Sequence, residues 1–406
     1  MIKLIIIADD LTGALDTGVQ FSKEGIKTLI TTDLNLDLKA LDEEAQVVVF
    51  DTESRHINMS LAYSLVSTLV EMGLSLGVEF FYKKTDSTLR GHIGSELSAI
   101  LDITCDNLMF IPAFPSNKRT TKDGKVYVND TLLHKTDFAK DPLNPIKSSS
   151  IKSIIREESK GSITLVKANT LIDIEKEGIY VFDAETEEDL FSIGEYLKSK
   201  DKLKFTSGSA GFARVLSKII DFKRTPTKMP CFKGSTLIIN GSVNSQSLKQ
   251  VSYAKELGYG SINISPEELF KRDFIRAIKE YKAFDEEKPF IINTITEREG
   301  IIEYYSYGEK INLSKVEISK VISENLGILT KDLLREKKTA NLVVFGGDTA
   351  IEILNNLNIK GIYALGEILT GVAIASLGEV MFITKAGGFG DTNLLELIIA
   401  HIKGRL

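Results

Sequence analysis

Short, continuously apolar runs alternate with amphipathic stretches along this chain, and this alternation constrains the fold more than any other feature. The strand-like runs lie at 3–8, 46–50, 80–82, 108–111, 163–167, 179–183, 203–207, 236–240, 289–295, 340–345 and 380–385, and the clearest helical stretches at 13–24, 60–76 and 94–102. Strands that are buried on both faces are apolar throughout, whereas strands with one exposed face alternate. The sequence therefore predicts an α/β protein with mostly parallel sheets flanked by helices.

The segment 221–234 interrupts the alternation with two prolines, four basic residues and no periodicity, which is typical of a linker. A chain of 406 residues is also long enough for two domains. We therefore expect domains at 1–225 and 235–406, with an active-site cleft between them. A second interruption, at 112–150, contains an Asp-Gly turn beside the strand-like run 125–130. It predicts a hairpin within an inserted flap or functional loop.

Composition excludes several classes of partner. The formal net charge of −6 disfavours nucleic acid as a partner, since nucleic-acid binders usually carry a concentrated basic surface. No apolar stretch approaches the length of a membrane span, and the short apolar N-terminus ends in two acids, unlike a signal peptide. The two cysteines, Cys105 and Cys231, lie far apart, and each is expected to be a small core residue in a reducing compartment. We therefore expect a cytoplasmic protein without nucleic-acid or membrane partners. The sequence leaves its oligomeric state open and allows a homo-oligomer.

Three glycine-bearing turns follow strands in the second half and lead into helices, at 241–245, 346–349 and 386–390. Ligands of open α/β sheets bind at the carboxyl ends of the strands. Glycine lets the backbone approach a ligand, and a helix N-terminus attracts phosphate. A single such turn commonly serves packing alone, but three in one domain favour a nucleotide or phosphate site. Because the P-loop and dinucleotide fingerprints are absent, the chain is neither an ordinary P-loop protein nor a typical dinucleotide binder.

Polar clusters follow three strands of the first half, at 9–10, 51–56 and 83–91. Carboxylates accept hydrogen bonds from sugar hydroxyls, and an arginine fork can hold both oxygens of a ligand carboxylate. The clusters therefore fit a polyhydroxy acid. Structural alternatives stay open, because one of the paired aspartates is expected to cap a helix and one of the paired lysines at 83–84 to face solvent. Arg55 and Arg90 could equally form internal salt bridges, for example with Glu53 or Asp86.

Several motifs resemble the four-carbon acid sugar kinase family, in order and over nearly the whole chain. They are ADDLTGALDTG at 8–18, TESRH at 52–56, KKTDSTLRG at 83–91, PAFP and RTT within 112–121, GSAGFA at 208–213, GS at 241–242, GGDTA at 346–350 and KAGGFG at 385–390. The resemblance implies phosphorylation of the terminal hydroxyl of a four-carbon sugar acid, such as threonate, erythronate or 3-oxo-tetronate. It also implies ATP and Mg²⁺ as cofactors, an N-terminal substrate domain and a C-terminal nucleotide domain.

The family's site residues carry over by position. Those for the substrate fall on Asp9 or Asp10, Arg55, Lys84, Thr85, Asp86 and Ser87, and those for the nucleotide on Ser242, Gly346, Gly347, Asp348, Thr349, Gly387, Gly388 and Gly390. His92 and Lys118 depart from the family's pattern, where asparagine and glycine are expected. Both flank substrate motifs, so the departures bear on which acid is used.

Two roles are predicted from position. Arg90, together with Arg55, is expected to bind the substrate carboxylate, because both arginines follow strands of the first domain by a few residues. Asp348 is the first candidate for the base that accepts the hydroxyl proton, since it lies in a Gly-Gly-Asp turn at a helix start. Asp86 and Asp10 are its rivals, and the metal ligands stay open.

Two other classes compete with a kinase. A non-catalytic sugar-acid sensor would bind the acid without turning over ATP. A dehydrogenase on a related α/β scaffold would need the dinucleotide fingerprint that the chain lacks.

Overall fold

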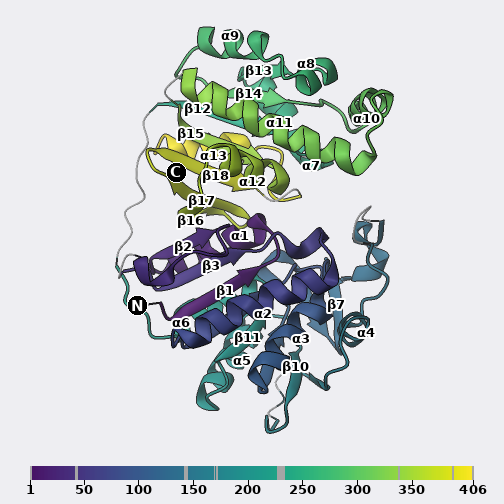
Figure 1. Cartoon of the computed structure of the whole chain (residues 1–406), viewed down its shortest axis with the longest axis vertical. Coiled ribbons are helices and arrows are strands. Elements are labelled where there is room, and N and C mark those ends of the chain that lie inside the picture. Colours follow the sequence, from purple (N-terminus) through teal and green to yellow (C-terminus); the bar gives the residue numbers. More distant parts are fainter. Residues whose placement is uncertain are drawn as a thin grey trace. The chain divides into compact units, whose positions relative to one another are not determined.

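The computed structural model describes residues 2–41, 44–140, 145–168, 170, 172–225, 234–336, 339–385 and 388–404. The chain divides into two compact units, Met1–Thr227 and Lys228–Leu406. Each unit is an open sheet covered by helices, which confirms the predicted fold class (Figure 1). The division lies within the expected linker 221–234, of which residues 226–233 are outside the described part of the chain.

The sheet of the first unit is parallel throughout and has the order β2-β3-β1-β4-β11-β5-β10-β9. Its strands are β1 (Leu4–Ala8), β2 (Thr28–Thr31), β3 (Val47–Asp51), β4 (Phe80–Lys84), β5 (Asn107–Ile111), β9 (Ile163–Val166), β10 (Gly178–Phe182) and β11 (Phe205–Gly208). Because β1 lies between β3 and β4, the carboxyl ends of these three strands meet at one edge of the sheet. The polar clusters predicted from the sequence follow these three strands.

Helices cover both faces of this sheet. They are α1 (Leu11–Ser22), α2 (Met59–Ser75), α3 (Ile93–Thr104), α4 (Ile151–Arg156), α5 (Glu187–Ser199) and α6 (Ala210–Ile219). Helix α6 contacts α1 and α5, while α3 contacts α2 and α4, so the helices form two layers (Figure 1). Val66, Leu97 and Ile151 of the second layer belong to the main apolar core. Cys105, expected in the core, is instead exposed, because it caps the C-terminus of α3 with φ of 48°.

The segment after β5 forms a small antiparallel sheet, referred to below as the flap. It consists of β6 (Arg119–Lys122), β7 (Lys125–Val128) and β8 (Thr131–Leu132). The predicted hairpin is confirmed, with Asp123 and Gly124 at its turn in the left-handed region (φ of 48° and 67°). Hydrogen bonds tie the flap to the end of β10, because the Thr121 amide donates to Ala184 O (2.9 Å).

The sheet of the second unit has the order β13-β14-β12-β15-β18-β17-β16. Its strands are β12 (Ser235–Asn240), β13 (Gly260–Asn263), β14 (Phe290–Asn293), β15 (Thr339–Phe345), β16 (Gly361–Leu369), β17 (Val372–Leu377) and β18 (Val380–Lys385). The neighbouring strands β13, β14, β12, β15 and β18 are parallel. β18, β17 and β16 form an antiparallel meander. β12, β15 and β18 are neighbours, so the three glycine-bearing turns follow adjacent strands.

The helices of the second unit are α7 (Ser245–Glu256), α8 (Pro266–Lys271), α9 (Ile275–Ala283), α10 (Ile301–Lys310), α11 (Lys315–Glu336), α12 (Gly347–Asn356) and α13 (Leu394–Ile402). A separate apolar core includes Val251, Val343 and Leu395, from α7, β15 and α13. Within the described ranges, no helix of either unit has the length and apolar character needed to cross a membrane.

Candidate functional site

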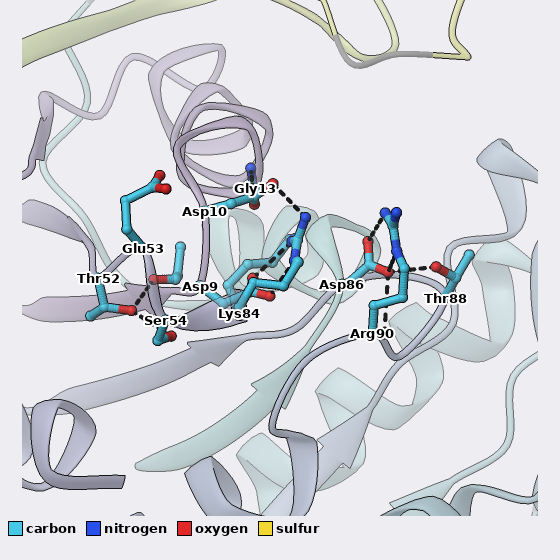
Figure 2. Close-up of polar contacts among 12 residues, drawn as sticks. Asp9, Asp10, Gly13, Thr52, Glu53, Ser54, Lys84, Asp86, Thr88 and Arg90 are labelled. Atoms are coloured by element: carbon cyan, nitrogen blue, oxygen red, sulfur yellow. Dashed lines mark hydrogen bonds and ion pairs between the residues drawn. The ribbon is translucent and has the colours of Figure 1, made fainter. Parts of the chain in front are cut away.

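An arginine joins two aspartates at the carboxyl edge of the first sheet. The Nε and Nη2 atoms of Arg55 donate to the two carboxylate oxygens of Asp9 (2.7 and 3.1 Å), and Nη1 donates to Asp10 Oδ2 (2.6 Å). Asp10 also caps α1, because its Oδ1 accepts a hydrogen bond from the Gly13 amide (2.8 Å; Figure 2). One of the paired aspartates was expected to cap a helix, and Asp10 does so.

The charges in this cluster depend on one another. Burial alone would raise the pKa of Asp9, but Arg55 and then Lys83 outweigh it, so that this pKa lies below its ordinary value. Burial opposes the charge of Arg55 as well, yet Asp10 and Asp9 hold the pKa of the guanidinium well above its usual range. Asp9 is therefore ionised, and Arg55 is held by its contacts with Asp9 and Asp10.

The two lysines at the end of β4 have different surroundings, because successive side chains of a strand point to opposite faces. Lys83 Nζ is fully buried and pairs with Glu96 Oε2 (2.9 Å), whose other carboxylate oxygen accepts from Ser54 Oγ (2.6 Å). Lys84 is also buried, at 4% exposure, but its Nζ forms no ion pair or hydrogen bond with another described residue. The expectation that one of the lysines faces solvent is therefore wrong.

Gly13 makes room for the ammonium group of Lys84 at the start of α1. A Cβ atom at position 13 would lie 2.9 Å from Lys84 Nζ and 2.6 Å from Asp10 Oδ1. The Lys84 ammonium thus lies against the backbone at the start of α1.

Asp86 forms a closed pair with Arg90. Arg90 Nε and Nη2 donate to the two carboxylate oxygens of Asp86 (2.7 and 3.1 Å), and the Thr88 hydroxyl donates to Oδ2 as well. Burial would raise the pKa of Asp86, but Arg90 and Arg55 hold it well below the usual range. Because both oxygens are occupied and the proton affinity is low, Asp86 is a weaker candidate for a general base than the sequence indicated.

Thr85 lies between Lys84 and Asp86 in the sequence. Its Oγ1 is buried and has no hydrogen-bond partner, whereas the Thr85 amide is bound to Gly208 O (2.8 Å). Buried hydroxyls are nearly always bonded, so an unfilled one at this edge indicates a place for a polar ligand. Ser87, predicted with them, is partly exposed at the same edge.

His92, one of the two departures from the family pattern, ties the Arg55 loop to the helices behind it. Its Nδ1 lies 2.9 Å from Glu158 Oε1 and its Nε2 lies 2.7 Å from Ile57 O. Both neighbours are acceptors, so only the protonated ring can donate to both. Burial lowers the pKa of His92, but Glu158 and the carbonyl outweigh it and raise this pKa above its ordinary value.

The charge on His92 predicts a pH dependence of stability. Because its folded-state pKa is raised, the stabilisation is fully present below about pH 6.5 and is lost as the pH rises through the folded-state value. We expect His92→Asn to lower the free energy of unfolding by about 1.5 kcal/mol at pH 6, and by less at pH 9. Urea unfolding at several pH values measures this. His134→Asn, in the same unit, is the control, and a constant difference between His92→Asn and the natural protein across the pH range would contradict the assignment.

In the second unit, the turns after β12 and β15 are in contact. The Gly241 amide donates to Phe345 O (2.9 Å), and a Cβ atom at position 241 would collide with Thr349 Oγ1. Gly346, with φ of 113°, lies against Gly241 and against the amide of Ser242, which a Cβ at 346 would approach within 3.6 Å. The sequence-predicted residues Ser242, Gly346, Gly347 and Thr349 are thus brought together.

Helix α12 begins here without a side-chain cap, since Gly346 is its N-cap residue. The uncapped N–H groups and the partial positive charge of the helix end are suited to an anion. Asp348, in the first turn, is exposed and has no hydrogen bond to another described residue. Its carboxylate is therefore available, in contrast to that of Asp86.

The turn after β18 is held by two glutamines of α7 that sequence reasoning missed. Gln250 Nε2 donates to the carbonyls of Phe389, Gly390 and Asp391 (2.9 to 3.0 Å), and Gln246 Nε2 donates to Gly390 O (2.9 Å). Their spacing of four residues on one helix was the available signal, because it places both on the same face. Gly387 lies outside the described residues, but Gly388 and Gly390 belong to this turn.

A buried lysine completes the attachment of this turn to α7. Lys385 Nζ donates to Ser247 Oγ (2.7 Å) and to Gln250 Oε1 (2.8 Å), and burial lowers its pKa to about 7. The three turns after β12, β15 and β18 therefore form one glycine-lined edge. No cluster of three or more histidine, cysteine, aspartate or glutamate side chains suited to a metal occurs in the part of the chain that is described.

In comparison with known proteins, each of the two units matches a different domain model. Residues 4–216 match the model of a sugar-binding N-terminal domain, and residues 237–395 match that of a nucleotide-binding C-terminal domain. The chain belongs to the family that these two domains define, the four-carbon acid sugar kinases, which confirms the resemblance seen in its motifs.

Relatives with assigned names match over nearly their full length. A D-threonate kinase of Salmonella typhimurium is 28% identical, with 97% of this chain and 96% of the relative covered. A D-erythronate kinase of Heliobacterium modesticaldum is 26% identical (97% and 95% covered), and a 3-oxo-tetronate kinase of Cupriavidus necator is 24% identical (98% and 96% covered). A solved structure of a Haemophilus influenzae protein shares the fold, with a TM-score of 0.74, 21% identity and 99% and 100% of the two chains covered.

Proposed function

We propose that this protein is a kinase that transfers the γ-phosphoryl group of ATP to the terminal hydroxyl of a four-carbon sugar acid. The observation that carries the proposal is a pair of polar groups at the first edge that have no side-chain partner among the described residues, the Lys84 ammonium and the buried Thr85 hydroxyl. Both are suited to an oxygen-rich anion, and they lie in the unit that matches a sugar-binding domain. The kinase names of full-length relatives support the same reaction.

At the first edge, Lys84 and Thr85 would bind oxygens of the acid. Asp9, Asp10, Arg55, Asp86, Ser87 and Arg90 complete the proposed substrate set. Because the guanidinium groups of Arg55 and Arg90 are held by aspartates, they offer a ligand only their remaining N–H donors. Their proposed role is therefore to donate additional hydrogen bonds to the acid from positions that the aspartates fix.

At the second edge, the backbone of Ser242, Gly346, Gly347, Thr349 and the 387–390 turn would hold the phosphates of ATP. Mg²⁺ fits this arrangement, because it is commonly held by one or two carboxylates together with substrate phosphates. No carboxylate is assigned to it here, because Asp348 is proposed below for the proton of the attacking hydroxyl. Bound Mg²⁺ would offset the negative charge of the phosphates.

Asp348 is proposed as the group that accepts or orients the proton of the attacking hydroxyl. A carboxylate that is unpaired and exposed can take this role more readily than Asp86, whose pKa is strongly depressed. The reaction needs the hydroxyl and the γ-phosphate to meet, so a cleft between the two sets of residues remains part of the proposal.

The decisive experiment is a coupled assay of ADP release with Mg-ATP and a panel of four-carbon sugar acids. The proposal expects ADP release that depends on one of threonate, erythronate or 3-oxo-tetronate. Acid binding measured by calorimetry without any ADP release would instead favour a non-catalytic sensor. Absence of both binding and turnover would overturn the proposal.

Gly388→Val tests the nucleotide edge. A Cβ atom at position 388 would meet nothing nearer than Asn244 Nδ2 at 3.9 Å, so the backbone accepts a side chain there. The added methyl groups would prevent a phosphate from approaching the turn, and we expect the KM for ATP to rise at least about tenfold. The KM for the acid and the melting temperature should stay close to those of the natural protein. Glu379→Ala, at the exposed turn between β17 and β18 in the same unit, is the control, and unchanged ATP kinetics in folded Gly388→Val would remove this turn from the site.

A further inference from the structure

A third arginine, Arg119, lies at the first edge and is outside every residue set assigned above. It begins β6, the first strand of the flap, which follows β5. β5 neighbours β11, and β11 neighbours β4, which leads into Asp86. The flap therefore starts at the carboxyl edge where the acid is proposed to bind.

The guanidinium of Arg119 differs from those of Arg55 and Arg90, because no carboxylate of a described residue is paired with it. Its Nη1 donates to Asn117 O (2.6 Å), but its Nε is buried and has no hydrogen-bond partner. In the described part of the chain it forms no ion pair. Burial is the main influence on the pKa of Arg119 and lowers it, and the attraction of Asp86 does not compensate.

Arg119 and Arg90 share an aromatic neighbour in the flap segment. The central carbons of their guanidinium groups lie 6.0 and 5.5 Å from the centre of the Phe138 ring. Such contacts orient a guanidinium but do not neutralise it. Asp86 is the one carboxylate that influences both arginines, and Arg90 already occupies its two oxygens. The charge of Arg119 is therefore left without a carboxylate partner among the described residues.

The side of the Arg119 guanidinium that carries Nε and Nη2 has no hydrogen bond to a described residue, and the same side of Arg55 and of Arg90 binds a carboxylate. Arg55 holds Asp9, and Arg90 holds Asp86, each through Nε and Nη2. In Arg119 these two atoms are the ones without a hydrogen bond to a described residue. A guanidinium oriented in this way can hold both oxygens of a carboxylate, and a buried carboxylate needs such a cation.

We propose that Arg119 binds the carboxylate of the sugar acid, and that through it the flap selects acids over neutral polyols of the same length. This inference rests on the proposed function and adds the residue that reads the acid's charge. Under this proposal Arg90 has a different role: it fixes Asp86 and, together with Phe138, orients Arg119.

The test compares Arg119→Met and Arg119→Lys with the natural protein, using the sugar acid found in the ADP-release panel and the neutral four-carbon polyol of matching stereochemistry. We expect Arg119→Met to raise the KM and the calorimetric Kd for the acid at least about tenfold, with the KM for ATP changed less than about twofold. The ratio of kcat/KM for acid over polyol should fall by a similar factor. Arg119→Lys should restore part of the acid affinity, because it keeps the charge but not the fork.

Lys122→Met is the matched control, since Lys122 lies on the same strand and pairs with the exposed Glu185. It should leave the acid selectivity unchanged. ATP binding and the melting temperature report whether each variant is folded, and Arg119→Gln replaces Arg119→Met if the latter does not fold. An unchanged acid Kd and acid-over-polyol ratio in a folded variant, with the natural protein active, would overturn this inference alone. A natural protein that releases no ADP with any of the acids would overturn the proposed function, and this inference with it.

Discussion

Asp348→Asn is expected to lower kcat by about 10²- to 10⁴-fold while the KM values for ATP and the acid change less than about threefold. A positioned proton acceptor contributes in this range, and it acts in the transition state and not in substrate binding. Asparagine keeps the size of the side chain and can still donate or accept a hydrogen bond, but it cannot take a proton at neutral pH. The expected signature is thus a loss in kcat without a matching loss in affinity.

The structure favours Asp348 over its rivals because of what each carboxylate already binds. Asp86 has both oxygens filled by Arg90 and Thr88, and Asp10 accepts from the Gly13 amide and from Arg55. Asp348 is exposed at the uncapped start of α12, and its carboxylate has no hydrogen bond or ion pair with another described residue.

Steady-state kinetics of Asp348→Asn, Asp86→Asn and Glu352→Gln decide between these residues. Glu352→Gln, one turn further along α12, is the control and should keep kcat within about twofold. Asp86→Asn should mainly weaken acid binding and stability, because it releases Arg90. If kcat falls strongly in Asp86→Asn and survives in Asp348→Asn, the two roles are reversed.

The parallel core of both sheets could be predicted because its strands are apolar throughout. β1, β3, β12 and β15 are fully buried and match the predicted runs. β16 was missed because its buried and partly exposed residues alternate, as expected for a strand of an antiparallel meander with one open face. β13 was missed because only Ile262 among its four residues is buried. β2 and β17 were missed as well, although nearly all of their residues are buried, because threonine, alanine and serine interrupt their large apolar residues. Runs of large apolar residues therefore find most central strands and the edge strand β9, but overlook strands built from small, polar or alternating residues.

The gathering of the candidate residues at one edge of the sheet could be predicted from the sequence, but their internal pairing could not. Position after a strand is a local property, and it brought Asp9, Arg55, Lys84 and Asp86 to one edge. Which charges neutralise one another depends on side-chain directions: Arg55 pairs with the aspartates after β1 and not with nearby Glu53. The free cations, Lys84 and Arg119, can be recognised only after the paired ones are known.

Arg55→Met is expected to lower the free energy of unfolding by about 3–5 kcal/mol, the usual loss when one member of a buried ion pair is removed. Asp9, which is 2% exposed, would be left with a buried charge and without the cation that binds both of its oxygens. Surface pairs behave differently, so Arg224→Met, which removes an exposed pair with Glu24, should cost less than about 1 kcal/mol and serves as the control.

The pH dependence of this loss has a definite sign. In the natural protein the pKa of Asp9 lies below its ordinary value of 3.8, so the contribution of the pair is present above that pH and is lost as the pH falls through the folded-state pKa. Without Arg55, burial would raise this pKa and Asp9 would take up a proton more readily. The deficit of Arg55→Met should therefore be largest near neutral pH and shrink toward pH 4 in urea unfolding experiments.

The double variant Arg55→Met/Asp9→Asn separates the structural role of Arg55 from a role in binding the acid. Removing the stranded charge should restore much of the lost stability, and a coupling energy between the two changes is expected because the side chains are in direct contact. If the stable double variant still has a raised KM for the acid, Arg55 contributes hydrogen bonds to the ligand as well as to the aspartates. If its KM for the acid is normal, Arg55 serves only to hold Asp9 and Asp10 in place. Arg119 and Lys84 are then the residues that bind the substrate carboxylate. A double variant no more stable than Arg55→Met would show instead that the loss comes from packing and not from an unpaired charge.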